Sequence, residues 1–312
     1  MSKKLALLTL AIMLVIPLPL YGCFGGSDGA GGLGGDVDVT DYTVTDQTGA
    51  AVILDQPAER VVVLSPSACE IVYAMGAGNL VIGRDEYCDW PAEAQALEVV
   101  QTDGQPDIER IIALDPDLVL VSTMGDDADQ YSKLTKADIA VYAIDANSLD
   151  QTYEAILQIG QLLGRDTEAQ DLVVGMEEAF AGLIDSPVAG TVYFEVSPLE
   201  HGLWTAGSGT FLNDVAERLG LTNIFADLDG WVEISEQQVL ELNPDYIVTL
   251  GMYPSEVQTP DEEILARANW QDVPAVQNGA VLYLPNNELT RPGPRLADGA
   301  IALREFAASH PV

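Results

Sequence analysis

Aromatic and polar residues alternate in several Gly- and Pro-containing stretches of this chain. The clearest examples are residues 87–91, Tyr-Cys-Asp-Trp-Pro, and residues 287–295, which contain Arg291. Flat aromatic faces with a few directed polar groups suit a large, planar and partly polar ligand. Each tryptophan, taken alone, could equally pack its own loop against the protein. The candidate ligand-binding residues are Ser67, Tyr87, Cys88, Trp90, Met124, His201, Trp204, Trp231, Asn287 and Arg291.

The same loops contain no recognisable catalytic set. The stretch Gly207-Ser208-Gly209 lacks the Gly-x-Ser-x-Gly pattern that places a nucleophilic serine on a sharp turn. The only histidines, His201 and His310, are too few for a metal centre built from imidazoles. We therefore predict neither a catalytic residue nor a metal site, and expect a protein that is not an enzyme. Whether Cys69 and Cys88 form a disulfide is left open by the sequence.

A repeated segment indicates how these loops are positioned. Residues 107–121 and residues 235–249 share a polar start, an amphipathic stretch ending in Leu, then Asp or Asn, Pro and Asp, and a short apolar run. That order predicts a helix, a turn and a buried parallel strand in each copy. This order of helix, turn and strand is also common in α/β proteins in general. The spacing favours two lobes built on one plan, with a cleft between them.

The predicted fold class is therefore α/β, with two Rossmann-like lobes joined by a long α-helical connector and a ligand cleft between the lobes. Residues 60–64 form a continuous apolar strand, after which Ser67 and Glu70 have the spacing of a capping box. Ligands bind at the carboxyl ends of such strands. Residues 149–184 carry apolar side chains at helical spacing, with a possible break at residues 164–166. The expected units are a signal peptide (1–22), a lipidated Cys and Gly-rich tether (23–38), an N-terminal lobe (39–147), a connector (148–186) and a C-terminal lobe (187–312).

The N-terminus indicates the compartment. A basic start, an apolar stretch containing two prolines, and Gly22 before Cys23 resemble a lipoprotein signal peptide. An uncleaved anchor helix is the alternative. We expect an extracytoplasmic protein, anchored to the cell membrane only through lipidated Cys23, because two or more acyl chains give stable anchoring. The 49 acidic residues outnumber the 13 basic ones, for a net charge of −36, which repels nucleic acid.

Six motifs carry a resemblance to a known family. They are Val-Val-Leu-Ser-Pro-Ser-Ala (62–68) with Glu70, Glu-Tyr-Cys-Asp-Trp-Pro (86–91), residues 108–117, Trp-Thr-Ala-Gly-Ser-Gly-Thr (204–210), Trp-Val-Glu-Ile-Ser (231–235) and Arg-Pro-Gly-Pro-Arg (291–295). From about residue 41 onward, the chain resembles the helical-backbone class (class III) of periplasmic solute-binding proteins of ABC importers. This group carries cobalamin, ferric siderophores and haem. The second and fourth motifs most resemble the cobalamin-binding members.

The resemblance implies a binding lipoprotein that delivers a corrinoid such as cobalamin to a permease and its ATPase. The corrinoid is then the transported ligand and no cofactor is expected. A ferric siderophore or haem is the alternative ligand, and an anchored enzyme or sensor on the same fold is a further alternative. Tyr87, Trp90, Trp204, Trp231 and Arg291 fall where family members contact the corrin and its nucleotide loop.

The chain departs from the cobalamin pattern at three positions. Asp103 and Ser122 stand where the best-known cobalamin binder has tryptophans, and Asn287 stands where it has an acid. The family docks on its permease through one carboxylate in each lobe. Glu109 matches this pattern in the first lobe, whereas the matching position in the second lobe is Gln237, with Glu236 one residue earlier. We expect Glu109 and Glu236 to be the docking residues, and His201 to be a loop histidine or a ligand of the corrinoid cobalt.

Overall fold

The computed structural model describes residues 42–123, 131–250, 258–285 and 287–312. Contacts divide the chain into the units Met1–Asp38 and Val39–Val312, and all described residues belong to the second. The predicted signal peptide, Cys23, the tether and Met124 lie outside the described residues. Among the residues that are described, no helix has the length and apolar character needed to cross a membrane.

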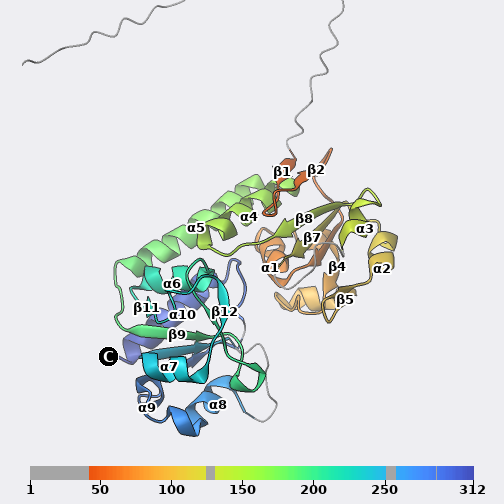
Figure 1. Ribbon diagram of the computed structural model, residues 1–312. Coiled ribbons are helices and arrows are strands. Elements are labelled where there is room, and N and C mark those ends of the chain that lie inside the picture. The colour runs from red at the N-terminus through yellow and green to blue at the C-terminus, as the bar shows by residue number, and fades with distance from the viewer. Residues whose placement is uncertain (1–41, 124–130, 251–257, 286) are drawn as a thin grey trace, which may run out of the picture. The chain divides into compact units, whose positions relative to one another are not determined.

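Strands between residues 61 and 144 form a six-stranded sheet (Figure 1). Its order is β6 (Gln105–Pro106), β5 (Val99–Thr102), β4 (Val81–Asp85), β3 (Val61–Leu64), β7 (Leu118–Ser122) and β8 (Ala140–Ile144), with only β6 antiparallel to its neighbour. The associated helices are α1 (Pro66–Ala74), α2 (Ile108–Ala113) and α3 (Ser132–Thr135). All four residues of β3 are buried, and alternate side chains enter two different apolar clusters. This explains the unbroken apolar run at residues 61–64, since a central parallel strand is covered on both faces.

Strands after residue 190 form a second, fully parallel sheet. Its order is β11 (Thr222–Asn223), β9 (Thr191–Glu195), β13 (Tyr246–Thr249) and β14 (Val281–Tyr283). The accompanying helices are α6 (Phe211–Leu219), α7 (Glu236–Leu242), α8 (Pro260–Ala266), α9 (Pro274–Gln277) and α10 (Leu296–Ser309). Two antiparallel pairs complete the described strands, namely β1 (Thr43–Thr45) with β2 (Ala51–Ile53), and β10 (Trp204–Ala206) with β12 (Trp231–Glu233).

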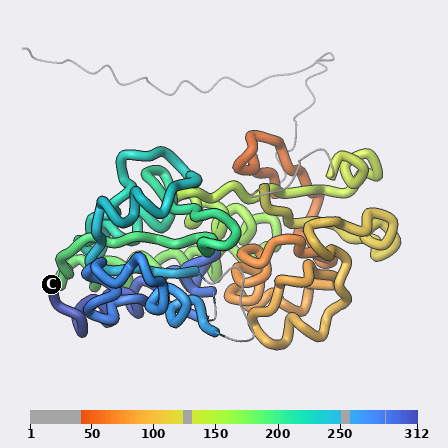
Figure 2. Tube along the Cα trace, turned by 60° about the horizontal axis from the view of Figure 1, so that its bottom comes forward, coloured from red at the N-terminus to blue at the C-terminus, as the bar shows by residue number. Residues whose placement is uncertain are grey.

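Two helices, α4 (Leu149–Leu162) and α5 (Asp166–Ile184), connect the two sheets in sequence. The chain turns between them at Gly164, whose φ of +62° suits glycine. Helix α4 packs against α1 and β1 on one side and α6 on the other, while α5 packs against α6 and α10. One apolar cluster accordingly runs from β3 through both helices to β13. Figure 1 shows α4 and α5 extending from the first sheet to the second, and Figure 2 shows the same chain trace from another side. A helical pair buried in this way restrains the lobes more than a Gly/Ser linker would.

The repeated segment has the same structure in both lobes. The helices begin after N-caps Asp107 and Ser235, and both end at a residue with positive φ, Asp115 at +51° or Asn243 at +53°. The aspartate that follows the proline then accepts a hydrogen bond from the backbone at the start of the neighbouring strand. The Asp117 carboxylate accepts a 2.8 Å hydrogen bond from the backbone N–H of Arg60, immediately before β3.

Asp245 does the same in the second lobe, where its carboxylate accepts a 2.8 Å hydrogen bond from the backbone N–H of Thr191, the first residue of β9. The repeat therefore encodes a structural connection between two strands, in addition to the order helix, turn and strand that the sequence predicts.

The expected capping box at Ser67 and Glu70 is wrong. Ser65 is the N-cap of α1, and its hydroxyl oxygen accepts a hydrogen bond from the backbone N–H of Ala68 at 3.4 Å. Pro66 occupies the first helical position, where its missing N–H costs nothing. Ser67 therefore lies inside the helix, and the carboxylate of Glu70 is free to make the interactions described below.

A matched pair of glycine substitutions tests the packing of α4 on α5. A Cβ at Gly160 would lie 2.4 Å from the Cβ of Ala169, whereas a Cβ at Gly175 would meet nothing within 4 Å. Gly160→Ala should lower the free energy of unfolding by about 1–3 kcal/mol because the helices must separate. Gly175→Ala should raise it by about 0.5–1 kcal/mol through helix propensity. Urea unfolding of both variants measures these changes, and equal effects would contradict the close approach.

Candidate ligand-binding site

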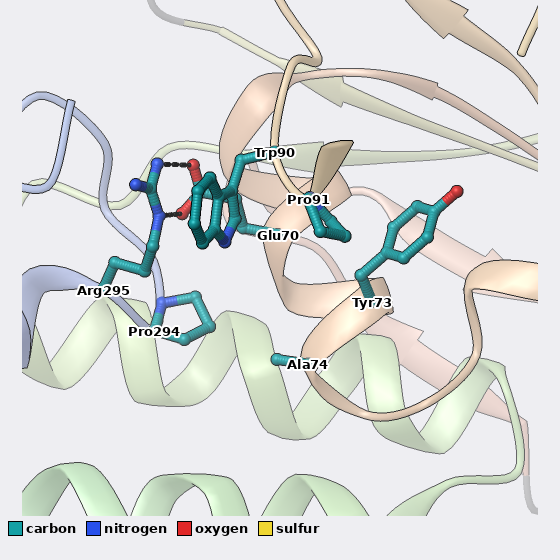
Figure 3. Close-up of a pocket in the computed structure, with 7 residues that line it drawn as sticks. All are labelled: Glu70, Tyr73, Ala74, Trp90, Pro91, Pro294 and Arg295. Atoms are coloured by element: carbon teal, nitrogen blue, oxygen red, sulfur yellow. Dashed lines mark hydrogen bonds and ion pairs between the residues drawn. The ribbon is translucent and has the colours of Figure 1, made fainter. Parts of the chain in front are cut away.

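A buried carboxylate connects the two lobes. Glu70 of α1 has only 2% of its side chain exposed, and it receives two arginines from the segment just before α10. Arg295 donates from Nε to Oε2 at 3.0 Å and from Nη2 to Oε1 at 2.6 Å, a two-pronged pairing visible in Figure 3. Arg291 adds a hydrogen bond from Nη1 to Oε1 at 2.9 Å. Charge-assisted bonds of this kind offset the cost of burying Glu70.

Arg291 also binds the loop at residues 87–91. Its Nη1 lies 2.7 Å from Oδ1 of Asp89, and its Nη2 donates to the carbonyl oxygen of Tyr87 at 3.1 Å. Burial lowers the pKa of Arg291, but the hydrogen bonds to Asp89 and Glu70 outweigh this effect and leave the pKa raised. The guanidinium is therefore charged, and it holds an aromatic loop of the first lobe against the second lobe.

Trp90 and two members of the ion-pair cluster, Glu70 and Arg295, line a small cavity. The guanidinium carbon of Arg295 lies 4.6 Å from the centre of the Trp90 ring. The cavity has a volume of about 170 Å³, and its lining residues are Glu70, Tyr73, Ala74, Trp90, Pro91, Pro294 and Arg295 (Figure 3). Sites for whole drug-sized ligands usually measure about 300–1,000 Å³. This cavity is therefore large enough for one substituent of a macrocyclic ligand but not for the ring.

Three aromatic side chains are exposed, two in the loop at residues 87–91 and one on a strand of the second lobe. Tyr87 is 56% exposed, Trp90 is 46% exposed and Trp204, on β10, is 41% exposed. Exposed aromatic faces of this kind are available to stack on a ligand, which would remove apolar area from water. They come from both lobes, so a planar ligand in contact with all three would touch both lobes.

Trp231 has a mixed role. Its ring packs against Phe211 with centroids 5.4 Å apart, and its indole N–H donates to Oδ1 of Asn147 at 3.3 Å. Asn147 immediately precedes the N-cap of α4, so the bond connects a second-lobe strand to the start of the connector. The side chain is half-buried, and part of its surface remains available to a ligand.

The other predicted contacts are less accessible. Cys88 is fully buried, and Ser67 is 5% exposed with its Oγ 2.9 Å from that of Ser65. Neither side chain offers a surface to a ligand in this conformation. His201 is about half-exposed, with its Nε2 3.5 Å from Oε1 of Glu200. Asn287 is half-buried, with a φ of +63°.

The two cysteines of the described chain are both free. The Sγ of Cys69 lies 3.5 Å from the carbonyl oxygen of Trp90, and the Sγ of Cys88 lies 3.7 Å from that of Val63. A hydrogen bond with Cys69, together with burial, raises the pKa of Cys88 well above its ordinary value. Both thiols therefore act as small, buried apolar groups, Cys88 within the loop at residues 87–91 and Cys69 in contact with it.

The two predicted docking carboxylates differ in environment. Glu109 is exposed on α2. Glu236, at the start of α7, is half-buried, and its Oε1 accepts a 2.8 Å hydrogen bond from the indole N–H of the fully buried Trp270. Its neighbour Gln237 is exposed and donates to Glu241 at 2.7 Å.

The aromatic and charged side chains described above can bind a ligand by stacking and hydrogen bonding. Within the described ranges, no group of three or more His, Cys, Asp or Glu side chains is arranged to hold a metal ion. The site predicted from the sequence includes the aromatic loops and Arg291, and their role in binding stays a prediction. Sequence reasoning missed the role of Glu70, Asp89 and Arg295 as a cluster, and it missed Asn147 entirely. The only signal for the cluster was the recurrence of Arg in residues 291–295.

Comparisons with known proteins agree with this architecture. A family model described as "Periplasmic binding protein" matches residues 61–288. An uncharacterised ABC transporter substrate-binding lipoprotein of Bacillus subtilis, YvrC, is 32% identical over 278 residues, which are 86% of this chain and 86% of that protein. The vitamin B12-binding protein of Salmonella paratyphi A is 35% identical over 198 residues, which are 62% of this chain and 73% of that protein.

A solved structure points to the same fold. It is the crystal structure of a possible iron-binding, periplasmic solute-binding protein from Staphylococcus epidermidis, with a TM-score of 0.68 and 29% identity over 80% of this chain and 99% of that one. The predicted α/β class is confirmed by the two sheets and by this likeness. Because the family model matches most of the chain, and the B. subtilis relative matches it nearly end to end, the chain belongs to the periplasmic binding protein family.

Proposed function

We propose that the protein is the substrate-binding component of an ABC importer and that its ligand is a corrinoid. The observation that carries this proposal is the set of exposed aromatic side chains, Tyr87 and Trp90 on one lobe and Trp204 on the other. A corrin ring is broad and nearly flat, so stacking against these rings removes apolar area of both partners from water. The name of the Salmonella relative supports the ligand, and that of the Bacillus relative supports the transport role.

The polar part of the site also suits a corrinoid. A corrin carries neutral amide side chains, which can accept from and donate to the arginines and carboxylates at the rim. The small cavity beside Trp90 can receive one such substituent. A ferric siderophore or haem is the alternative, favoured by the likeness to the possible iron-binding protein of S. epidermidis.

The direct test is the absorbance spectrum of the purified protein after exposure to cyanocobalamin, a ferric siderophore or haem and removal of free ligand. Retention of the corrinoid spectrum supports the proposal. Saturable retention of only an iron chelate would replace the corrinoid with the alternative ligand and leave the transport role intact.

We further propose that delivery occurs by docking on a permease driven by an ATPase, with Glu109 as the docking carboxylate of the first lobe. Its exposure on α2 leaves it free to pair with an arginine of the partner. In the second lobe, the hydrogen bond from Trp270 restricts Glu236, so that lobe docks with a weaker carboxylate contact. Anchoring through a lipidated Cys23 would keep the protein extracytoplasmic and near its permease.

Truncation of one exposed aromatic side chain tests its contact with the ligand. Trp204→Ala should weaken cyanocobalamin binding by more than about 1 kcal/mol, because a large aromatic contact is lost from the interface. Isothermal titration calorimetry measures this loss. The control is Ile53→Ala, which truncates a side chain 62% exposed on β2 and should leave affinity unchanged. Equal affinities for both variants and the original protein would remove Trp204 from the site.

The second prediction concerns docking. Glu109→Gln should reduce ligand uptake by cells or by reconstituted transporter by more than about tenfold, while calorimetry shows an unchanged affinity for the ligand. The loss of one member of a docked charge pair typically costs about 2–5 kcal/mol. Glu178→Gln, an equal change of charge on the exposed face of α5, is the matched control. Normal uptake by the Glu109 variant would argue that the first lobe docks by another surface.

The third prediction concerns the membrane. Cys23→Ser should shift the protein from the membrane fraction to the soluble extracytoplasmic fraction, because acyl chains then have no attachment site. The far-UV circular dichroism and thermal unfolding of the variant should match those of the original domain. Unchanged membrane association would favour an uncleaved N-terminal anchor.

A further inference from the structure

The charges that bridge the lobes sum to zero. Two carboxylates, Glu70 and Asp89, face two guanidinium groups, Arg291 and Arg295, at distances between 2.6 and 3.0 Å. The site therefore has arginines but no excess positive charge with which to attract an anion. The whole chain, with its net charge of −36, adds a repulsive potential.

The two carboxylates are not equivalent. Glu70 is 2% exposed and accepts from both arginines, so removing it would leave buried positive charge without a partner. Asp89 is 47% exposed and forms an ion pair with Arg291 but not with Arg295. The guanidinium of Arg291 is 11% exposed. Asp89 thus occupies the accessible side of Arg291, where an anionic ligand group would otherwise bind.

We propose that Asp89 selects ligands by charge: it occupies Arg291 and so disfavours chelates with exposed anionic groups relative to neutral ones. This inference rests on the proposed function and narrows it. The preferred ligand is a planar metal chelate that presents neutral groups to Arg291, as the amide-bearing rim of a corrin ring does. The phosphate in the nucleotide tail of a cobalamin must then lie away from this guanidinium. Haem, with its propionate carboxylates, and polyanionic catecholate chelates are disfavoured, because their charged groups must compete with Asp89 for the same guanidinium.

The replacement Asp89→Asn isolates this charge. An asparagine has the same size and can still accept from Arg291 through its amide oxygen, so the loop can keep its position. The cluster then carries one carboxylate against two guanidinium groups, a net charge of +1 from the groups above. A purely structural role for Asp89, such as holding the loop in place, would affect neutral and anionic ligands alike. A selective role affects them differently.

The experiment compares the dissociation constants of dicyanocobinamide, a corrinoid without the phosphate-bearing tail, and monomeric haem for the original protein, Asp89→Asn and Glu93→Gln. Glu93 is an exposed acid two residues beyond the same loop, so its change alters the total charge equally. Asp89→Asn should tighten haem binding about fivefold, the upper range for one exposed ion pair. It should change dicyanocobinamide binding less than about twofold, and Glu93→Gln should leave the ratio of the two constants unaltered.

Two results would overturn the inference. One is haem affinity that does not improve in Asp89→Asn, including binding undetectable in both proteins. The other is an equal change for both ligands, which assigns Asp89 a structural role. Failure of the original protein to bind any corrinoid would refute the proposed function instead, and the haem measurements would still decide the role of Asp89.

Discussion

A carboxylate buried at the junction of the lobes is the constraint on which the candidate site depends. Glu70 is almost completely shielded from water, and burial of an unpaired charge is costly. Two arginines that lie more than 220 residues later in the chain must therefore be in place for this region to be stable. Their backbone positions in turn fix the end of the second lobe against α1. The aromatic loop is fixed by the same arginines, through the carbonyl of Tyr87 and the ring of Trp90.

A second buried ion pair organises the other lobe in a similar way. Arg267 binds Glu195, at the carboxyl end of β9, through two hydrogen bonds of 2.8 and 2.9 Å. Burial raises the pKa of Glu195 even though Arg267 opposes the shift. The same guanidinium lies 4.4 Å from the centre of the Trp270 ring, whose N–H binds Glu236. The carboxylate at the start of α7 is thus part of the internal framework of the lobe, which makes the two proposed docking faces chemically unequal.

The sequence predicted the features that depend on local patterns. Apolar runs and the repeated Pro-Asp segments gave the strands, the helices and their pairing into two lobes, since periodicity reports burial directly. The start of α1 was misplaced because Ser65 and Ser67 are both acceptable caps, and only Pro66 distinguishes them. The partners of Glu70 could not be predicted, because they depend on how the lobes meet. Alternation within the loop at 87–91 likewise does not reveal that Cys88 faces inward while Tyr87 and Trp90 face water.

The two free thiols beneath that loop have a consequence for its dynamics. Cys69 and Cys88 have no solvent exposure, and the raised pKa of Cys88 keeps it in the unreactive thiol form. A soluble alkylating reagent can therefore reach them only when the loop lifts away from α1. The rate at which the two thiols are alkylated therefore reports how often the loop opens. A ligand bound to Tyr87 and Trp90 would slow this alkylation without contacting either sulfur atom.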